Sequence, residues 1–255
     1  MNAKVAIVTG GLSGIGLAAA KELGRRGHRV AVGSRSGADS KRRECVEAVL
    51  EAKGIALELD VGSQESVDRF VAETRDRLGT PLILVNAAGI FREGFLADHS
   101  DPAWFDQIDI NLSGPFRMIR AVFPSMASAG FGRIVNIAST AAAKGASGYA
   151  AYCASKAGLV GLGLAVSQEG APNNVCCISI SPTWVETPMM DAAVLRRTKA
   201  GGKDTESARI DIENSNPQNR IVQPSEIASI IGYFCTDAPR ALTNIDIQVN
   251  AGADW

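Results

Sequence analysis

The first residues of the chain form a short apolar run that ends at glycine. Residues 4–10, KVAIVTG, are β-branched and almost continuously apolar, which is typical of a strand that is buried on both faces. From Gly14 to Arg26 the apolar residues recur at helical spacing, and Gly27 marks the end of that segment. The pattern therefore predicts a buried strand followed by an amphipathic helix.

Strand-like and helix-like segments alternate in the same way along the rest of the chain. Because the strands are apolar on both faces, they indicate a parallel sheet covered by helices on each side. We therefore expect an α/β fold of the Rossmann type, a doubly wound parallel sheet of about seven strands in a three-layer αβα arrangement, forming one domain over residues 1–255. Further strands are predicted at residues 29–34, 55–61, 82–89, 133–139, 175–181 and 245–250, and further helices at residues 39–53, 63–78, 102–128, 149–169 and 225–236.

Two segments depart from this regular alternation. Pro115 lies inside the predicted helix 102–128, which indicates a kink or two abutting helices. Residues 189–223 are polar and separate the sixth strand from the last helix. An excursion at the C-terminal edge of a sheet is often a substrate lid, and a solvated surface insertion is the alternative. The second segment carries the basic residues Arg196, Arg197, Lys199 and Lys203.

Composition and charge exclude several classes of function. The net charge of −1 gives no overall attraction to nucleic acid or to an anionic membrane, so we expect neither as a partner. The two histidines, His28 and His99, cannot form a three-histidine metal site; we predict no metal and place both histidines at the surface. The five cysteines form no CxxC pair and are expected to be reduced and mostly buried. No apolar run approaches the roughly 18 residues of a membrane span, and the N-terminal run is too short for a signal peptide, so a cytoplasmic location is expected.

A glycine cluster lies where the first strand meets the first helix. In TGGLSGIG, residues 9–16, Gly10, Gly14 and Gly16 permit a tight turn and the close approach of a diphosphate to the helix N-terminus. The lysine of a nucleoside triphosphate loop is absent from this segment. The cluster therefore predicts a dinucleotide site, with a purely structural turn as the alternative.

The end of the second strand indicates which dinucleotide is bound. A carboxylate at this position would hydrogen-bond the adenosine ribose and repel a 2′-phosphate. The chain instead has Ser34 followed by Arg35, and a hydroxyl beside a guanidinium suits a phosphate dianion. We therefore predict NADP (NADPH) as the preferred cofactor, NAD being less favoured; a solvated Arg35 without this role is the alternative.

The remaining motifs occur in a specific order and spacing. Asp60-Val61 follow the third strand, NAAG (residues 86–89) follows the fourth, Asn111 lies in INLSGPF, and Ser139 ends the fifth strand thirteen residues before YCASK, residues 152–156. With these motifs the sequence resembles the short-chain dehydrogenase/reductase family, in its short single-domain branch, along nearly its entire length. The resemblance implies that Asn111, Ser139, Tyr152 and Lys156 form the catalytic set.

The chemistry of the four residues explains their spacing. Tyr152 and Lys156 are four residues apart on one helix, so their side chains share a face. An ammonium near the phenol is expected to lower the pKa of Tyr152 from its usual value of about 10, so that Tyr152 acts as general acid/base. Ser139 would hydrogen-bond the same substrate oxygen.

Further roles rest on the resemblance alone. It implies that Lys156 also holds the nicotinamide ribose, that Asn111 anchors a water connecting Lys156 to solvent, and that the protein is a homotetramer. Three segments depart from the family pattern: Ala87 replaces an asparagine, Thr183 replaces a glycine beside Trp184, and Asn250-Ala251-Gly252 stands where Asp-Gly-Gly is usual. The residues expected to contact the cofactor are Gly10, Leu12, Ser13, Gly14, Ile15, Gly16, Ser34, Arg35, Asp60, Val61, Asn86, Ala87, Gly89, Tyr152, Lys156, Pro182, Val185 and Thr187.

Together these features indicate an NADP(H)-dependent oxidoreductase that interconverts a carbonyl and a secondary alcohol in a small-molecule substrate by hydride transfer. The substrate stays open among ketones, 3-oxoacyl thioesters and sugar-like compounds. A catalytically silent dinucleotide-binding sensor or scaffold is the alternative. Phe91, Phe95, Trp184 and Met189 suggest an apolar wall, while Arg92 or an arginine of the lid is a candidate to hold a carboxylate or phosphate.

Overall fold

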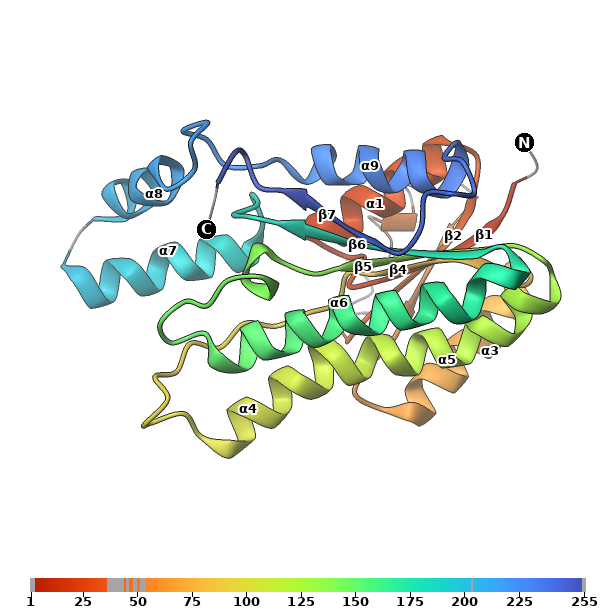
Figure 1. The fold of residues 1–255 in the computed structure, drawn as a ribbon, viewed down its shortest axis with the longest axis horizontal. Helices are drawn as coiled ribbons and strands as arrows, with labels where there is room; N and C mark the ends of the chain where they lie inside the picture. Colours follow the sequence, from red (N-terminus) through yellow and green to blue (C-terminus); the bar gives the residue numbers. More distant parts are fainter. Residues whose placement is uncertain are drawn as a thin grey trace.

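The seven strands found in the described part of the chain belong to one parallel sheet. The computed structural model describes residues 3–35, 44, 46, 47, 50, 54–202 and 204–253. The sheet has the order β3-β2-β1-β4-β5-β6-β7, and every neighbouring pair is parallel. This confirms the predicted doubly wound α/β fold (Figure 1). The strands are β1 (Val5–Thr9), β2 (Arg29–Ser34), β3 (Gly54–Glu58), β4 (Pro81–Asn86), β5 (Gly132–Ile137), β6 (Val175–Pro182) and β7 (Ile245–Val249).

Helices cover both faces of the sheet and complete the three layers. The first layer contains α1 (Gly14–Arg25) and α9 (Pro224–Thr236), and the second contains α3 (Gln64–Leu78), α4 (Asp101–Ile108), α5 (Gly114–Ser128) and α6 (Ala150–Gly170) (Figure 1). The predicted helix 39–53 lies largely outside the described residues.

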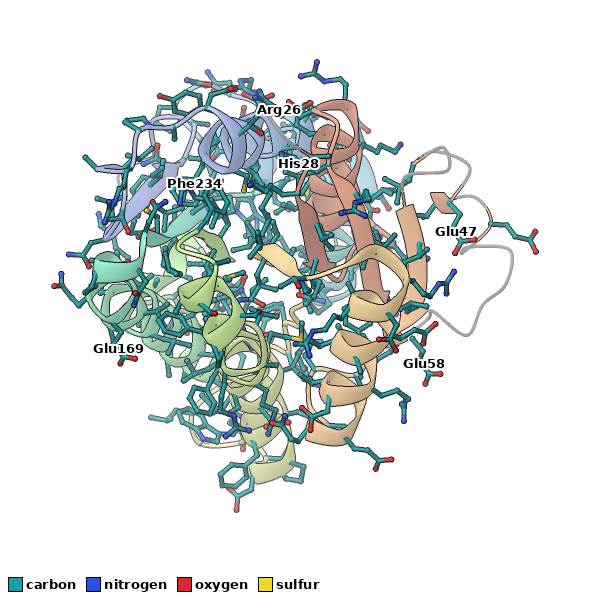
Figure 2. The ribbon with its side chains drawn as sticks, turned by 90° about the vertical axis from the view of Figure 1, so that its right-hand side faces the viewer. Arg26, His28, Glu47, Glu58, Glu169 and Phe234 are labelled. Carbon is teal, nitrogen blue, oxygen red and sulfur yellow. The ribbon has the colours of Figure 1, made fainter. Side chains whose placement is uncertain are left out.

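Each face of the sheet carries its own apolar core. Val32 and Phe234 belong to the core beneath α1 and α9, whereas Phe70 belongs to the opposite one. The adjacent Cys176 and Cys177 fall into different cores, as the alternation of side chains along a strand requires. In Figure 2, Phe234 points inward from its helix, while Glu58 and Glu169 lie at the periphery.

Two strands end three residues earlier than the sequence pattern predicts. Strand β3 ends at Glu58 rather than at residue 61, and β4 ends at Asn86 rather than at residue 89. After Asn86 the chain leaves the sheet, and the backbone N–H groups of Ala87 and Ala88 both bond to the hydroxyl of Thr9, at 3.1 and 3.0 Å. The apolar residues beyond each strand therefore line the carboxyl edge of the sheet instead of extending it.

The long helical segment before β5 consists of two abutting helices. Helix α4 passes through a π-helical turn, Asp109–Ser113, into α5, and Pro115 occupies the first turn of α5, where its missing N–H needs no partner. This is one of the two outcomes that Pro115 predicts. The π-turn places Asn111 in the buried interior.

Residues 189–202 and 204–223 are folded, although the polar composition of this segment suggests an irregular excursion. They form most of α7 (Pro188–Gly201) and all of α8 (Thr205–Asn214), which project beyond the carboxyl edge of the sheet (Figure 1). A small apolar core of their own holds them together, and α8 is joined to the segment after β6 by Arg209, which bonds Glu186. That core comprises Met190, Val194, Ala208, Ile212 and Ile221, with Trp184 packed against it.

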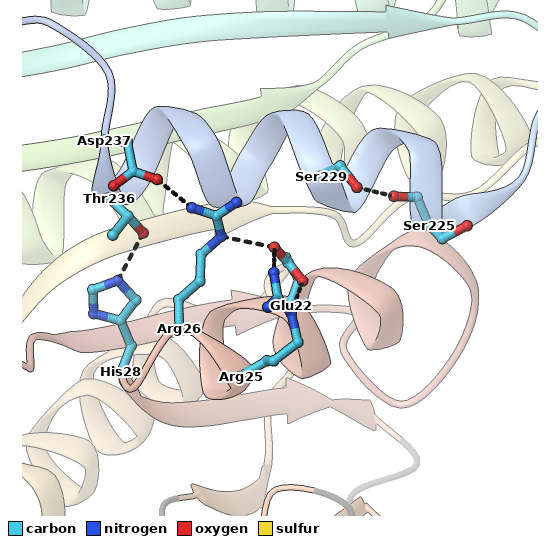
Figure 3. A network of polar contacts seen from close by, with 8 residues as sticks. All are labelled: Glu22, Arg25, Arg26, His28, Ser225, Ser229, Thr236 and Asp237. Carbon is cyan, nitrogen blue, oxygen red and sulfur yellow. Dashed lines mark hydrogen bonds and ion pairs between the residues drawn. The ribbon is translucent and has the colours of Figure 1, made fainter.

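The predicted surface position of His28 is wrong. Its side chain is only 4% exposed, because the turn after α1 lies beneath the end of α9. The imidazole Nδ1 accepts from the Lys4 backbone N–H at 3.2 Å, and Nε2 lies 3.1 Å from the Thr236 hydroxyl. Figure 3 shows this contact beside Arg26, which bridges Glu22 and Asp237.

Helix α6, in the second layer of helices, is unusually apolar. The stretch Ala150–Asn173 would be long and apolar enough to cross a membrane by length and composition alone. In the structure, however, α6 packs against β6 and against α4 within the fold. This packing accounts for part of its apolar character, since 39% of the most apolar window of the stretch is buried.

Candidate active site

A large cavity opens at the carboxyl edge of the sheet. It has a volume of about 560 Å³ and runs from the glycine loop, across the ends of β1, β4, β5 and β6, to the first turns of α7. A cavity at this edge is expected, because β1 lies between β2 and β4 and the chain connections diverge there. A volume of this size suits a cofactor together with a small substrate.

The glycine loop has the geometry that a diphosphate requires. Gly10 and Gly14 have φ angles of +65° and +51°, which favour glycine. A Cβ on Gly16 would lie 2.5 Å from the carbonyl oxygen of Gly10, so the loop and helix α1 approach as closely as backbones can. Ser13 makes no side-chain cap and the first turn has no acidic residue, so the helix N-terminus faces the cavity with its N–H groups available.

The end of β2 lies at the same side of the cavity. Ser34 and the exposed Arg35 both line it, and Asp60 and Val61 lie across from them after β3. The Asp60 carboxylate accepts a hydrogen bond from the Gly62 N–H at 2.9 Å, which fixes its orientation. The residues present therefore fit a dinucleotide whose adenosine end carries a phosphate.

Three of the predicted catalytic residues converge on the centre of the cavity. Tyr152 and Lys156 project from the first turns of α6, and Ser139 lies just after β5. The Ser139 side chain hydrogen-bonds Tyr152. The ammonium of Lys156 lies 5.7 Å from the centre of the Tyr152 ring and donates to the carbonyl oxygen of Ile137 at 2.7 Å.

Burial controls the protonation of Tyr152 and Lys156. Desolvation raises the pKa of Tyr152 to about 12, although the hydrogen bond from Ser139 opposes this shift. Desolvation lowers the pKa of Lys156 to about 8. The expected lowering of the pKa of Tyr152 by the ammonium is therefore wrong for this structure, in which that ammonium bonds to a backbone carbonyl instead. The phenol is protonated at neutral pH.

Three predicted site residues lie behind the cavity wall rather than on it. Leu12 packs into the core beneath α1, and the amide of Asn86 donates to the Asn136 side chain at 2.9 Å. Asn111 is fully buried and binds the backbone of Ile90 through both of its amide atoms, at 2.8 and 2.9 Å. The other predicted cofactor residues, and Ser139, Tyr152 and Lys156 of the predicted catalytic set, line the cavity.

The departure at Thr183 is accommodated without strain. Its φ is not in the left-handed region, so glycine is not required at this position. Its hydroxyl donates to the side chain of Asn216 at 3.0 Å, which joins the end of β6 to the segment after α8. The added side chain lines the cavity beside Trp184.

An aromatic cluster forms the wall on the substrate side. The ring of Phe91 contacts Tyr149 at 4.5 Å and Tyr152 edge-on at 5.1 Å, measured between ring centroids. The predicted role of Arg92 is not seen, because its guanidinium bonds Asp106 at 2.6 Å and does not line the cavity. Phe95 is likewise 60% exposed and outside the wall. Tyr149 is a wall residue that no motif of the sequence singles out.

Comparisons with known proteins agree with this geometry. The family model described as short chain dehydrogenase matches residues 4–198. A putative ketoacyl reductase of the monensin polyketide synthase from Streptomyces virginiae is 40% identical, with 98% of this chain and 96% of the relative covered. The 3-oxoacyl-[acyl-carrier-protein] reductase FabG of Pseudomonas aeruginosa is 34% identical, with 99% of this chain and 98% of the relative covered.

A solved structure extends the similarity to three dimensions. A single-substitution variant of actinorhodin polyketide ketoreductase, in which a tryptophan replaces a phenylalanine, was crystallised with NADPH and matches with a TM-score of 0.94 at 34% identity. The match covers 99% of this chain and 98% of that chain. The motifs, the sheet order and these matches extend over the same residues, and the chain belongs to the short-chain dehydrogenase family.

Proposed function

We propose that the protein is an NADP(H)-dependent oxidoreductase that reduces a ketone to a secondary alcohol, with Tyr152 as the general acid. One observation carries this proposal. Ser139, Tyr152 and Lys156 converge on a cavity that continues to a glycine loop at a helix N-terminus. A silent sensor or scaffold would need the loop, but it would have no use for the three converging side chains.

The residues of the chain divide the chemistry between them. NADPH, when bound, supplies a hydride to the carbonyl carbon. The Ser139 hydroxyl donates a hydrogen bond to the carbonyl oxygen and orients it. The phenol of Tyr152 then transfers its proton to that oxygen. Burial raises the pKa of Tyr152 to about 12, so the phenol carries the proton that this step requires.

Lys156 and Asn111 support this centre from behind. The ammonium of Lys156 lies 5.7 Å from the centre of the Tyr152 ring, and we assign it the contact with the nicotinamide ribose that the family resemblance implies. Asn111 joins the loop after β4 to α6, because its amide also donates to the Ser155 hydroxyl at 3.1 Å. We assign it a positioning role.

NADP is the cofactor that the binding residues favour. Arg35 and Ser34 replace the carboxylate that selects NAD, and a guanidinium and a hydroxyl suit a 2′-phosphate. Support also comes from the actinorhodin ketoreductase, which was crystallised with NADPH.

The wider setting is inferred from the family and the relatives. We place the substrate among ketones of the 3-oxoacyl type, because the similar proteins include ketoacyl reductases and an acetoacetyl-CoA reductase. We also infer a single catalytic domain, a lid formed by residues 189–223, a homotetramer, and a cytoplasmic location without nucleic-acid or membrane partners.

NADPH oxidation tests the proposal directly. The purified chain is incubated with acetoacetyl-CoA, ethyl acetoacetate, a cyclic ketone and an aldehyde, and the loss of NADPH absorbance is followed. We expect turnover of at least one ketone, and about 10²- to 10⁴-fold slower turnover by Tyr152→Phe because the proton donor is lost.

Cofactor binding provides the control for the tyrosine variant. Tyr152→Phe should bind NADPH nearly as tightly as the wild-type protein, measured by fluorescence titration. Tight NADPH binding without turnover of any substrate would contradict the reductase and favour the silent sensor.

A further inference from the structure

A second, smaller pocket adjoins the substrate side of the main cavity. Its volume is about 270 Å³, and Ala146, Tyr149, Trp184 and Ala193 line both spaces. The pocket is thus a continuation of the cavity away from the glycine loop. It is completed by Glu93, Ser147, Arg196 and Arg197, and we call it the arginine pocket.

Arg196 is held in this pocket by an aromatic ring. Its guanidinium lies 4.9 Å from the centre of the Phe91 ring, and that ring contacts Tyr152 edge-on. The Phe91 ring therefore lies between the guanidinium of Arg196 and the proposed proton donor Tyr152, and it contacts both. Such stacking orients a guanidinium without using its N–H donors.

Two of the three guanidinium nitrogens of Arg196 lack a hydrogen-bond acceptor within the ranges that the structure describes. Its Nε and Nη2 atoms are shielded from solvent and have no hydrogen-bond partner among the described residues. Glu93 forms an ion pair with Arg196 through Nε, but its carboxylate oxygen lies 3.7 Å away, which is beyond hydrogen-bond distance. The Nε and Nη2 hydrogens point outward from one edge of the planar group, and this two-pronged edge matches the two oxygens of a carboxylate.

A third unpaired donor belongs to the same pocket. The indole Nε1 of Trp184 is buried and has no acceptor within the described part of the chain. Buried donors without acceptors are rare in folded proteins, and they indicate that a further group belongs in the site.

The charges of the pocket favour an anion. Arg197 stacks on Trp184 at 5.2 Å and hydrogen-bonds Tyr149, so it too faces this space. Two guanidinium groups therefore face one carboxylate, that of Glu93, among the lining residues. A bound carboxylate would balance the charge.

We propose that the arginine pocket binds a carboxylate at the end of the substrate remote from the carbonyl that Tyr152 protonates. The substrate class is then an oxo acid, whose ketone lies in the main cavity and whose carboxylate is not changed by the reaction. This proposal rests on the proposed reductase function, although the pocket can be tested without catalysis.

Binding of a carboxylate that cannot be reduced tests the pocket itself. Hexanoate and hexanamide have the same shape and differ in charge, and both are titrated calorimetrically into the purified protein. We expect hexanoate to bind, hexanamide to bind about tenfold more weakly or not at all, and Arg196→Gln to weaken hexanoate binding by about tenfold or more.

Two further variants test whether hexanoate binding depends on the two-donor edge of Arg196, and not only on positive charge or on a folded protein. Arg196→Lys keeps the positive charge but lacks the two-donor edge, so it should bind hexanoate more weakly than the wild type. Lys199→Gln removes one charge from an exposed position on the same helix, outside the pocket, and should bind hexanoate normally. Equal binding of hexanoate and hexanamide, or unchanged hexanoate binding by a folded Arg196→Gln variant, would overturn the proposal.

Kinetics then relate the pocket to the reaction. Methyl-ketone carboxylic acids of increasing chain length are compared with their methyl esters in the NADPH assay. We expect Arg196→Gln to raise KM for the best acid by about tenfold, with kcat and the KM for the ester little changed. Arg196-dependent hexanoate binding without turnover of any ketone would contradict the reductase and leave the carboxylate site standing. Turnover with identical KM changes for acid and ester would overturn the carboxylate site and leave the reductase standing.

Discussion

The lysine beside the proposed proton donor is held by the backbone rather than by the phenol. Its ammonium donates to the Ile137 carbonyl oxygen, and burial lowers the pKa of Lys156 to about 8. An ammonium has three N–H bonds, so this hydrogen bond leaves it further donors for a ligand in the cavity. The hydroxyl groups of a bound ribose are suitable acceptors, which agrees with the role that the family resemblance implies for Lys156.

Arg35 allows a direct test of cofactor choice. Arg35→Ala should weaken NADPH binding by about tenfold or more and leave NADH binding nearly unchanged, because only NADPH carries the 2′-phosphate. The measurement is a pair of dissociation constants from fluorescence titration. Arg29→Ala, at the other end of the same strand, removes an equal charge away from the cavity and serves as the control. Equal weakening of both cofactors by Arg35→Ala would contradict the phosphate role.

Individual residues show which parts of the site a sequence pattern can predict. The order of the motifs identified Ser139, Tyr152 and Lys156, which the fold brings to one cavity. It could not tell that Leu12 and Asn86 turn into the protein, because a motif fixes a backbone position but not the direction of each side chain. The unpaired donors of Arg196 follow from tertiary packing and have no signature in the sequence.

At the scale of elements, hydrophobic periodicity identified the strands and the helices that cover the sheet. It did not identify α7 and α8, because these helices bury their apolar residues against one another and not against the sheet. Local signals were present nevertheless: the side chains of Thr187 and Asp204 cap the two helices by accepting from backbone N–H groups three residues later, at 3.4 and 2.7 Å. Because the whole segment is polar, these two capping residues did not stand out from their neighbours in the sequence.

The outer faces of the second-layer helices bear on assembly. Phe105, Phe116 and Leu164 are 64%, 45% and 40% exposed on α4, α5 and α6. Large apolar side chains in such positions are suited to contact with another subunit. Light scattering should give four times the chain mass for the wild-type protein and a smaller mass for Leu164→Glu. Leu195→Glu, a change at a similarly exposed leucine on α7, should leave the mass unchanged, and a monomeric wild type would contradict the tetramer.

At the scale of the whole molecule, the contact between α1 and α9 makes stability depend on pH, because it buries His28. Burial lowers the pKa of His28, with the charges of Arg26 and Lys4 acting in the same direction and Asp237 opposing them. The unfolded chain therefore binds a proton more readily than the folded one. The contribution of the uncharged His28 to the free energy of unfolding is therefore fully present at pH values above its pKa in the unfolded chain, about 6.5. It is lost as the pH falls below that pKa.

Denaturant unfolding at a series of pH values tests this dependence. The wild-type protein should lose stability between about pH 7 and pH 5, and His28→Gln should lose less over that interval because the titrating group is gone. His99→Gln provides the control, since it removes the other histidine, which is partly exposed. Parallel pH profiles for the wild type and His28→Gln would contradict the argument.

The strand order has a consequence for how such a protein can change over time. The segments proposed to hold the diphosphate and the adenosine end of the dinucleotide follow β1, β2 and β3, whereas the aromatic wall, α7 and α8 follow β4, β5 and β6. The aromatic wall, α7 and α8 lie outside the sheet, and α7 and α8 are held together by a small apolar core of their own. Substitutions there can alter which molecule is accepted while the sheet and the nucleotide loop stay intact. New specificities can therefore arise by small steps without loss of the shared reductive chemistry.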